Sequence, residues 1–251
     1  MKLTPQQIAT FSRKGYLSPI PVMEAEEIVR IRAEFDRLEA EEGREKSQIG
    51  LLDRHLDRSF VWDIARDPRI LDSISSIIGP NILLLGTHFF CKYGPSHRFV
   101  AWHQDVTYWG LEPPDALTAW LAIDDSDTEN GCMQVIPGTH TTGIHEHGKS
   151  EREGNLLSIN QELTMTPEDE ARAVDMVLRA GEMSLHHGML VHGSLPNPST
   201  RRRCGLTLRY IPTSVRQVKL NSHGKRYTAI LVHGEDREQH FEEIASPVFG
   251  N

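Results

Sequence analysis

The chain has 251 residues, of which 38% are hydrophobic and 25% are charged, and its formal net charge at pH 7 is -8. This length and apolar fraction suit one domain of generous size or two small ones with a real core, and do not favour an intrinsically disordered chain. The acidic balance gives no general attraction to phosphate groups, so nucleic acid and anionic membranes are not expected partners.

Neither the apolar runs nor the cysteines indicate export or membrane insertion. No segment approaches the roughly eighteen consecutive apolar residues of a membrane helix, and residues 1–10 lack the apolar core of a signal peptide. Cys91, Cys132 and Cys204 form no C-x-x-C pair and are too few for a disulfide framework or a cysteine zinc site. We therefore expect a soluble cytoplasmic protein that acts on a small molecule, and its oligomeric state stays open.

Residues 1–80 read as helical. A capping box at Thr4 and a proline at the first helical position predict a helix that ends at Gly15. Apolar residues at spacings of three and four predict an amphipathic helix between Met23 and Gly43. A third helix is predicted from Asp67 to Gly79, where glycine and proline stop it.

From Asn81 the pattern changes to short segments rich in β-branched and aromatic residues, bounded by Gly, Pro or Asp. Parallel βαβ alternation is absent, so the pattern predicts an antiparallel jelly roll braced by the N-terminal helices. Residues from about 140 to 170 are polar with weak periodicity and are interpreted as a loop or lid. The chain reads as a single domain (1–251), with a β core at 81–214 and a C-terminal segment at 215–251.

Thirteen histidines make metal chemistry worth testing residue by residue. His103 and Asp105 stand at a predicted strand end, where alternation puts both on one face and Gln104 on the other. Such an H-x-D tripeptide is common by chance, and its plain interpretation is a surface or hydrogen-bonded pair. His186, His187 and His192 follow in a strand, turn, strand context, and any of them could supply a third ligand.

Two histidines and one carboxylate would form a facial triad, which leaves adjacent positions open and favours iron(II) for oxygen chemistry. A 2-oxo acid could take two of those positions, but its far carboxylate needs a cation, preferably arginine. Arg203, eleven residues after His192, is the candidate. A turn at residues 196–199 would bring 192 and 203 side by side on adjacent antiparallel strands.

The ordered motifs resemble the phytanoyl-CoA dioxygenase family of iron(II)- and 2-oxoglutarate-dependent oxygenases. The resemblance extends over most of the chain and rests on Trp102-His103-Gln104-Asp105, on the run Asn130-Gly131-Cys132-Met133-Gln134-Val135-Ile136-Pro137-Gly138-Thr139-His140, and on His192-Gly193-Ser194 followed by Arg203. It implies a double-stranded β-helix, a variant of the jelly roll reached above from the strand pattern.

The resemblance also implies a set of site residues. His103, Asp105 and His192 would bind iron, and Arg203 would bind the far carboxylate of 2-oxoglutarate. Gln104, Trp120 and Ser194 match positions that line the cosubstrate pocket. Six further residues flank the motif strands and could line a substrate pocket, with ordinary packing or surface charge as the alternative interpretation: His88, Arg98, Tyr108, Trp109, Arg209 and Arg216.

The implied chemistry is hydroxylation of a C–H bond, coupled to decarboxylation of 2-oxoglutarate to succinate. Relatives that halogenate replace the carboxylate ligand, so the presence of Asp105 favours oxygen transfer. Desaturation, cyclisation and oxidative N-dealkylation stay open as outcomes, and so does a cupin-like metalloprotein that takes no 2-oxo acid. The acidic chain is a poor match for a polyanionic coenzyme A, which favours a small, fairly polar metabolite from a biosynthetic pathway.

Overall fold

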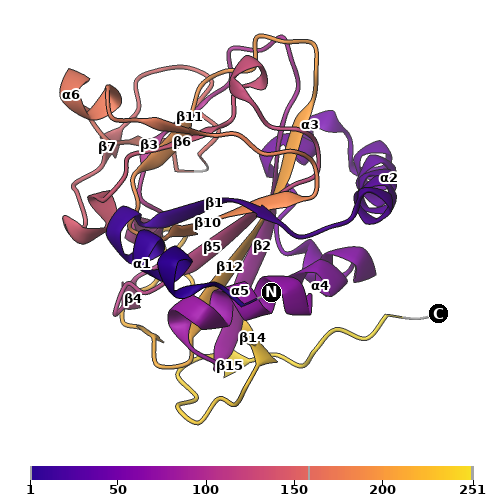
Figure 1. The fold of residues 1–251 in the computed structure, drawn as a ribbon, viewed down its shortest axis with the longest axis vertical. Coiled ribbons are helices and arrows are strands. Elements are labelled where there is room, and N and C mark those ends of the chain that lie inside the picture. Colours follow the sequence, from indigo (N-terminus) through magenta and orange to yellow (C-terminus); the bar gives the residue numbers. More distant parts are fainter. Residues whose placement is uncertain (1, 158, 250–251) are drawn as a thin grey trace.

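The structure is a computed structural model that describes residues 2–157 and 159–249, with the side chain of Tyr108 set aside. Two sheets form its centre (Figure 1), and their strand pairs are antiparallel except for β14 with β15, which run parallel. The larger sheet has seven strands in the order β1-β10-β5-β12-β2-β14-β15, and the smaller has four in the order β3-β11-β6-β9. This arrangement confirms the jelly roll predicted from the sequence.

The strands are β1 (Tyr16–Pro21), β2 (Ile82–Lys92), β3 (Val100–His103), β4 (Leu111–Glu112), β5 (Leu117–Ala122), β6 (Met133–Val135), β7 (Gly148–Lys149), β8 (Gln161–Glu162), β9 (Val174–Met176), β10 (Glu182–His187), β11 (His192–Ser194), β12 (Arg203–Pro212), β13 (Arg216–Gln217), β14 (Thr228–His233) and β15 (Glu242–Glu243). The α-helices are α1 (Pro5–Lys14), α2 (Ala25–Glu42), α3 (Arg44–Ile49), α4 (Ser59–Ala65), α5 (Pro68–Ile78) and α6 (Pro167–Glu170). Short 3-10 helices lie at η1 (Arg54–Leu56), η2 (Asp105–Tyr108), η3 (Thr128–Asn130) and η4 (Thr139–Thr141).

The three helices expected from the sequence are present as α1, α2 and α5. The Thr4 side chain accepts a hydrogen bond from the backbone N–H of Gln7, and Gly15 ends α1 with a φ of 81°. This left-handed conformation favours glycine. Asp67 caps α5 through the backbone N–H of Arg69. Among the described residues, none of the helices is long and apolar enough to cross a membrane.

The two faces of the larger sheet contact different parts of the molecule, because successive side chains of a strand point to opposite faces. One face packs against the helices: Leu117 and Leu121 of β5 and Leu206 of β12 share a buried cluster with Phe35 of α2 and Ile74 of α5. The opposite face looks toward the smaller sheet, which lies above the larger one in Figure 1 while α4 and α5 lie below. The space between the sheets is therefore available for a site.

The expectation that residues 1–80 are helical is wrong at β1. This strand contains Pro19 and Pro21, which disfavour a central strand because proline lacks an N–H donor. β1 lies at the edge of the sheet, where it pairs only with β10, and an edge strand tolerates prolines. The predicted loop at residues 140–170 also contains regular structure, namely the β7-β8 pair and all of α6.

The prediction that residues 192 and 203 lie on adjacent strands is also wrong. β11 belongs to the smaller sheet and β12 to the larger one, so the connection between them crosses from one sheet to the other. The amide of Asn197 donates hydrogen bonds to the carbonyls of Lys92 and Arg201, at 3.3 and 2.7 Å. These bonds hold the connection against the end of β2, so the chain enters the larger sheet there. The two residues nevertheless line one cavity from opposite sheets.

Candidate metal centre

His103, Asp105 and His192 converge between the two sheets. His103 ends β3, Asp105 begins η2 two residues later, and His192 begins β11, where it is the direct partner of His103. The Nε2 atoms of His103 and His192 lie 3.4 and 3.9 Å from Oδ1 of Asp105. One ligand atom from each residue fits within 4.8 Å of the others, which makes the three side chains a potential metal site.

Backbone and side-chain contacts orient all three groups. Nδ1 of His103 lies 2.8 Å from the carbonyl oxygen of Ala101, and Nδ1 of His192 lies 2.9 Å from that of Leu190. A carbonyl can only accept, so each Nδ1 carries the proton, and in the neutral ring each Nε2 has a lone pair of the kind that binds a metal. The Thr118 hydroxyl donates to Oδ2 of Asp105 at 3.2 Å. Such outer contacts are typical of metal ligands, and this donor set fits iron(II).

The electrostatics favour the forms of these side chains that could bind a metal. Burial alone would raise the pKa of Asp105, but the surrounding His103, His186 and His192 side chains hold that pKa well below its usual range. Burial, followed by the nearby His103, lowers the pKa of His192 well below its usual value. The carboxylate is therefore charged and the His192 imidazole neutral at pH 7, as metal coordination requires.

His186 and His187, the alternative third ligands, lie elsewhere in the site. His187 turns away from the triad: its Nδ1 accepts a hydrogen bond from the backbone of Met189, and its Nε2 lies 4.0 Å from Asp115. His186 is 1% exposed and its ring centroid lies 4.7 Å from that of His192. Neither of its nitrogens has a hydrogen-bond partner in the described part of the chain, and Nε2 is 3.8 Å from Asp105. His186 is thus beside the triad, while His192 completes it.

Arg203 lies in the same cavity and is 3% exposed. Its guanidinium stacks on the ring of Trp120 at 4.8 Å, and its Nε donates to the Ser126 hydroxyl at 3.3 Å. No carboxylate of the described residues lies within 4.0 Å of it, and burial lowers its pKa to about 10. A buried cation without an acidic partner is costly unless an anion binds there.

Lys92 is a second buried basic side chain, which the sequence analysis missed. It is the direct partner of Arg203 across β2 and β12, and burial together with Arg203 lowers its pKa well below the usual value. Its Nζ donates to the Ser194 hydroxyl at 2.6 Å and to the carbonyl of Leu195. The available signal was a lone lysine at the end of an otherwise apolar strand.

Of the three cosubstrate-pocket residues expected from the family resemblance, two line the cavity and one does not. Trp120 and Ser194 line the cavity. Gln104 lies outside its lining: the amide nitrogen donates to the carbonyls of Gly143 and Met189, and the amide oxygen accepts from the N–H of His145. The Gln104 side chain therefore links the 140–170 segment to Met189, which precedes β11, and does not face the cavity.

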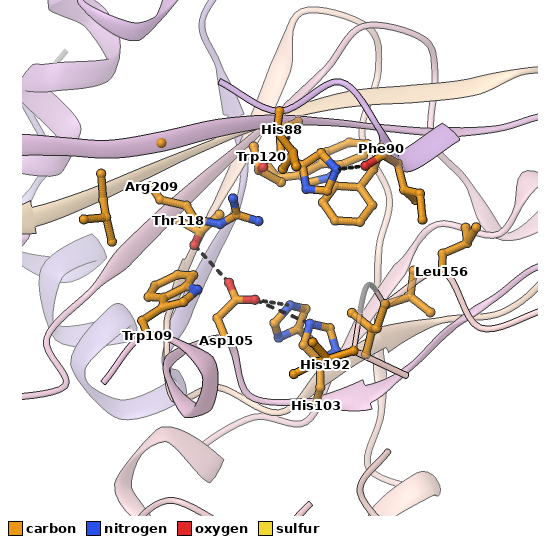
Figure 2. Close-up of a pocket in the computed structure, with 18 of the residues that line it drawn as sticks. His88, Phe90, His103, Asp105, Trp109, Thr118, Trp120, Leu156, His192 and Arg209 are labelled. Atoms are coloured by element: carbon orange, nitrogen blue, oxygen red, sulfur yellow. Dashed lines mark hydrogen bonds and ion pairs between the residues drawn. The ribbon is translucent and has the colours of Figure 1, made fainter. Parts of the chain in front are cut away.

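The cavity has a volume of about 520 Å³, within the range of small-molecule sites. Of the six substrate-pocket candidates, His88, Trp109 and Arg209 line it. Arg98 is absent from the lining, and Arg216 is 59% exposed on its side chain and lies 3.5 Å from Glu112. The side chain of Tyr108 lies outside the described part of the structure. Figure 2 shows Trp109 and Arg209 on one side of Asp105 and the two ligand histidines on the other.

Comparisons with known proteins identify the family of the chain. The family model for phytanoyl-CoA dioxygenase (PhyH) matches residues 11–205. Peroxisomal phytanoyl-CoA dioxygenase from Homo sapiens is 27% identical over 218 residues, which cover 78% of this chain and 64% of the human protein. The chain thus matches slightly less than two thirds of the length of that relative.

Two solved structures are similar over nearly the whole chain. The non-heme monooxygenase ThoJ in its apo form has a TM-score of 0.79 and 28% identity, covering 96% of this chain and 88% of ThoJ. CytC3 with Fe(II) and alpha-ketoglutarate has a TM-score of 0.72 and 28% identity, covering 97% of this chain and 93% of CytC3. With the family model matching most of its length, the chain belongs to the phytanoyl-CoA dioxygenase family of Fe(II)- and 2-oxoglutarate-dependent oxygenases.

Proposed function

We propose that this protein is a dioxygenase that binds iron(II) through His103, Asp105 and His192, and 2-oxoglutarate through Arg203. It hydroxylates a C–H bond of a small metabolite. One observation carries the proposal: a cavity between the sheets holds a converging His-Asp-His set and a buried arginine without an acidic partner among the described residues. The first feature suits an iron with open positions, and the second suits a dicarboxylate cosubstrate.

The overall reaction is R–H plus 2-oxoglutarate plus O₂, giving R–OH plus succinate plus CO₂. One oxygen atom enters the product and the other enters succinate, while the four electrons that reduce O₂ come from the C–H bond and the oxo acid. Bound iron supplies the activation of O₂. Asp105 occupies the position whose carboxylate oxygen-transferring relatives keep, so hydroxylation is the proposed outcome over halogenation.

The side chains of this chain position the reactants. The carbonyls of Ala101 and Leu190 and the Thr118 hydroxyl fix the three ligands. The stacking of Arg203 on Trp120 holds the guanidinium plane, which leaves its two terminal nitrogens for a forked contact with a carboxylate. The enclosing sheets keep bulk water from the reacting groups.

The first test is spectroscopic and needs no substrate. Iron(II) and 2-oxoglutarate are added anaerobically to the purified protein, and the visible charge-transfer band of the bidentate complex is measured. We expect the band in the wild type, its loss in Asp105→Ala through loss of iron, and its weakening in Arg203→Ala at limiting 2-oxoglutarate. The exposed Arg216→Ala serves as the matched arginine control and should behave as the wild type.

Iron stoichiometry is measured in parallel for every variant. If the wild type binds one iron yet shows no band at saturating 2-oxoglutarate, the 2-oxoglutarate assignment is wrong. A cupin-like metalloprotein that uses no 2-oxo acid is then the better account. If Asp105→Ala binds iron as tightly as the wild type does, the ligand assignment fails instead.

A further inference from the structure

Arg209 is a second arginine that faces the cavity from β12. Arg203, Thr207 and Arg209 alternate along this strand and all line the cavity, because residues two apart share a face. Arg209 is the direct partner of Thr118 on β5, and the Thr118 hydroxyl binds Asp105. The Arg209 backbone therefore lies one strand away from the group that orients a metal ligand (Figure 2).

Among the described residues, the guanidinium of Arg209 has no partner of opposite charge. It lies 5.5 Å from the ring centroid of Trp109, which covers it on one side. Its Nε is buried without a hydrogen-bond partner. Within the described part of the chain, no carboxylate lies within 4.0 Å of the guanidinium, and none of its nitrogens makes a hydrogen bond under the usual distance limit. A cation held in this way is costly to keep unless the complete complex supplies an anion.

The charges around the cavity leave room for one negative group. With iron and 2-oxoglutarate bound as proposed, the metal, Asp105, the cosubstrate dianion and Arg203 cancel. The remaining acid and bases of fixed charge in the lining are Asp53, Arg209 and Lys225, which leave one excess positive charge. Asp53 also has a structural task, since its Oδ1 accepts the backbone N–H of Thr87 at 3.0 Å. The excess contrasts with the acidic chain as a whole, whose net charge is -8.

The cavity wall also has an apolar part, beside polar residues such as Asn221 and Lys225. Leu85 and Phe90 come from β2, and Leu156 comes from the 140–170 segment. Such a wall suits a hydrocarbon or aromatic body that leaves water when it binds. A single unpaired guanidinium beside it suits one planar oxyanion, for which arginine has the matching fork.

We propose that the substrate carries a carboxylate, which Arg209 binds in the space beside Trp109, and an apolar body that lies against Leu85, Phe90 and Leu156. The one excess positive charge favours a carboxylate monoanion over a phosphate dianion. This inference rests on the proposed function, because the charge balance assumes that iron and 2-oxoglutarate occupy their sites. It assigns Arg203 to the cosubstrate and Arg209 to the substrate.

The test uses pairs of probes that differ only in charge: octanoate with octanamide, and phenylacetate with phenylacetamide. Dissociation constants are measured anaerobically by calorimetry on full-length protein saturated with iron(II) and 2-oxoglutarate. We expect at least one acid to bind the wild type about 10- to 100-fold more tightly than its amide, as a charge-assisted hydrogen bond would give. Arg209→Leu should remove this preference, and the control Arg216→Leu should keep it.

The charge-transfer band separates this proposal from the proposed function. It should persist in Arg209→Leu, which shows that the variant is folded and still binds iron and 2-oxoglutarate. The carboxylate proposal is overturned if each amide binds as tightly as its acid, if no acid binds, or if the preference survives in Arg209→Leu. Loss of the band from the wild type would instead refute the proposed function, whatever the probes do.

Discussion

The two ends of the cavity are built from the same parts. Each end has an arginine from β12 without an acidic partner in the described residues, stacked on a tryptophan: Arg203 on Trp120, and Arg209 on Trp109. Each also has a basic side chain from β2 whose pKa is lowered, in part by the nearby arginine: Lys92 at one end and His88 at the other. Both ends are therefore short of negative charge.

The ends differ in how far they are closed. Arg203 is 3% exposed, and its Nε is bound to Ser126, so its end has fixed walls. At the other end Arg209 is only half-buried, and the segment between β13 and β14 contributes Asn221 and Lys225 to the lining. Rigid walls suit a cosubstrate of constant length, whereas an end covered by a loop can vary with the substrate. Under our proposals, specificity is set at the Arg209 end.

The largest expected effect concerns stability at the Arg209 end. Burial, helped by the charge of Arg209, lowers the pKa of His88 from 6.5 to about 3. Between these values the unfolded chain binds a proton that the folded protein does not, so stability falls as the pH falls through this window. On moving from pH 7 to pH 4 this costs about 3 kcal/mol. His88→Gln keeps a donor for the carbonyl of Ile49 but cannot titrate.

Urea unfolding at both pH values measures this effect. The loss of unfolding free energy between pH 7 and pH 4 should be about 3 kcal/mol smaller in His88→Gln than in the wild type. His97→Gln, at an exposed histidine, is the control and should lose as much stability as the wild type. Equal losses in His88→Gln and the wild type would show that His88 is protonated in the folded protein.

The second effect separates the two arginines by ligand. Arg203→Leu should weaken 2-oxoglutarate binding by about 10- to 100-fold, because it removes a charge-assisted forked contact. Arg209→Leu should change it by less than about twofold, since Arg209 belongs to the other end. Titration of the charge-transfer band at limiting 2-oxoglutarate gives both dissociation constants. If 2-oxoglutarate binding weakened equally in the two variants, the assignment of Arg203 to the cosubstrate and Arg209 to the substrate would be wrong.

The comparison also shows what the sequence could predict. Local signals were sufficient for α1 and α5, because capping residues and glycines act on their own helix. The convergence of His103 and Asp105 followed from strand alternation, and His192 and Arg203 followed from ordered motifs. These residues stand in short segments whose spacing carries the information.

The features that could not be predicted from the sequence depend on contacts between segments far apart in the chain. Lys92 lies buried beside Arg203 only because β2 pairs with β12, and nothing next to it in the sequence signals this pairing. The separation of β11 and β12 into different sheets depends on Asn197, which binds the end of β2 across more than 100 positions. Arg209 was noted as a lining candidate, but its lack of an acidic partner is a property of the folded cavity.

The smallest expected effect is a change in proton uptake at the Arg203 end. Burial and the adjacent Arg203 favour the neutral form of Lys92, and so hold its pKa well below the usual value. A 2-oxoglutarate dianion bound at Arg203 would offset that positive charge and raise the pKa of Lys92 again. Binding should therefore take up a fraction of a proton at pH values between the free and bound pKa values.

Calorimetric titrations of the iron(II) protein in two buffers of different ionisation enthalpy measure this uptake, over a series of pH values. Lys92→Met should abolish the part that depends on Lys92, and Arg216→Leu should leave it unchanged. If the wild type and Lys92→Met take up the same number of protons at every pH, Lys92 does not sense the cosubstrate. Its task would then be confined to holding the Ser194 hydroxyl and the Leu195 carbonyl, and the two ends of the cavity would be less alike than their composition indicates.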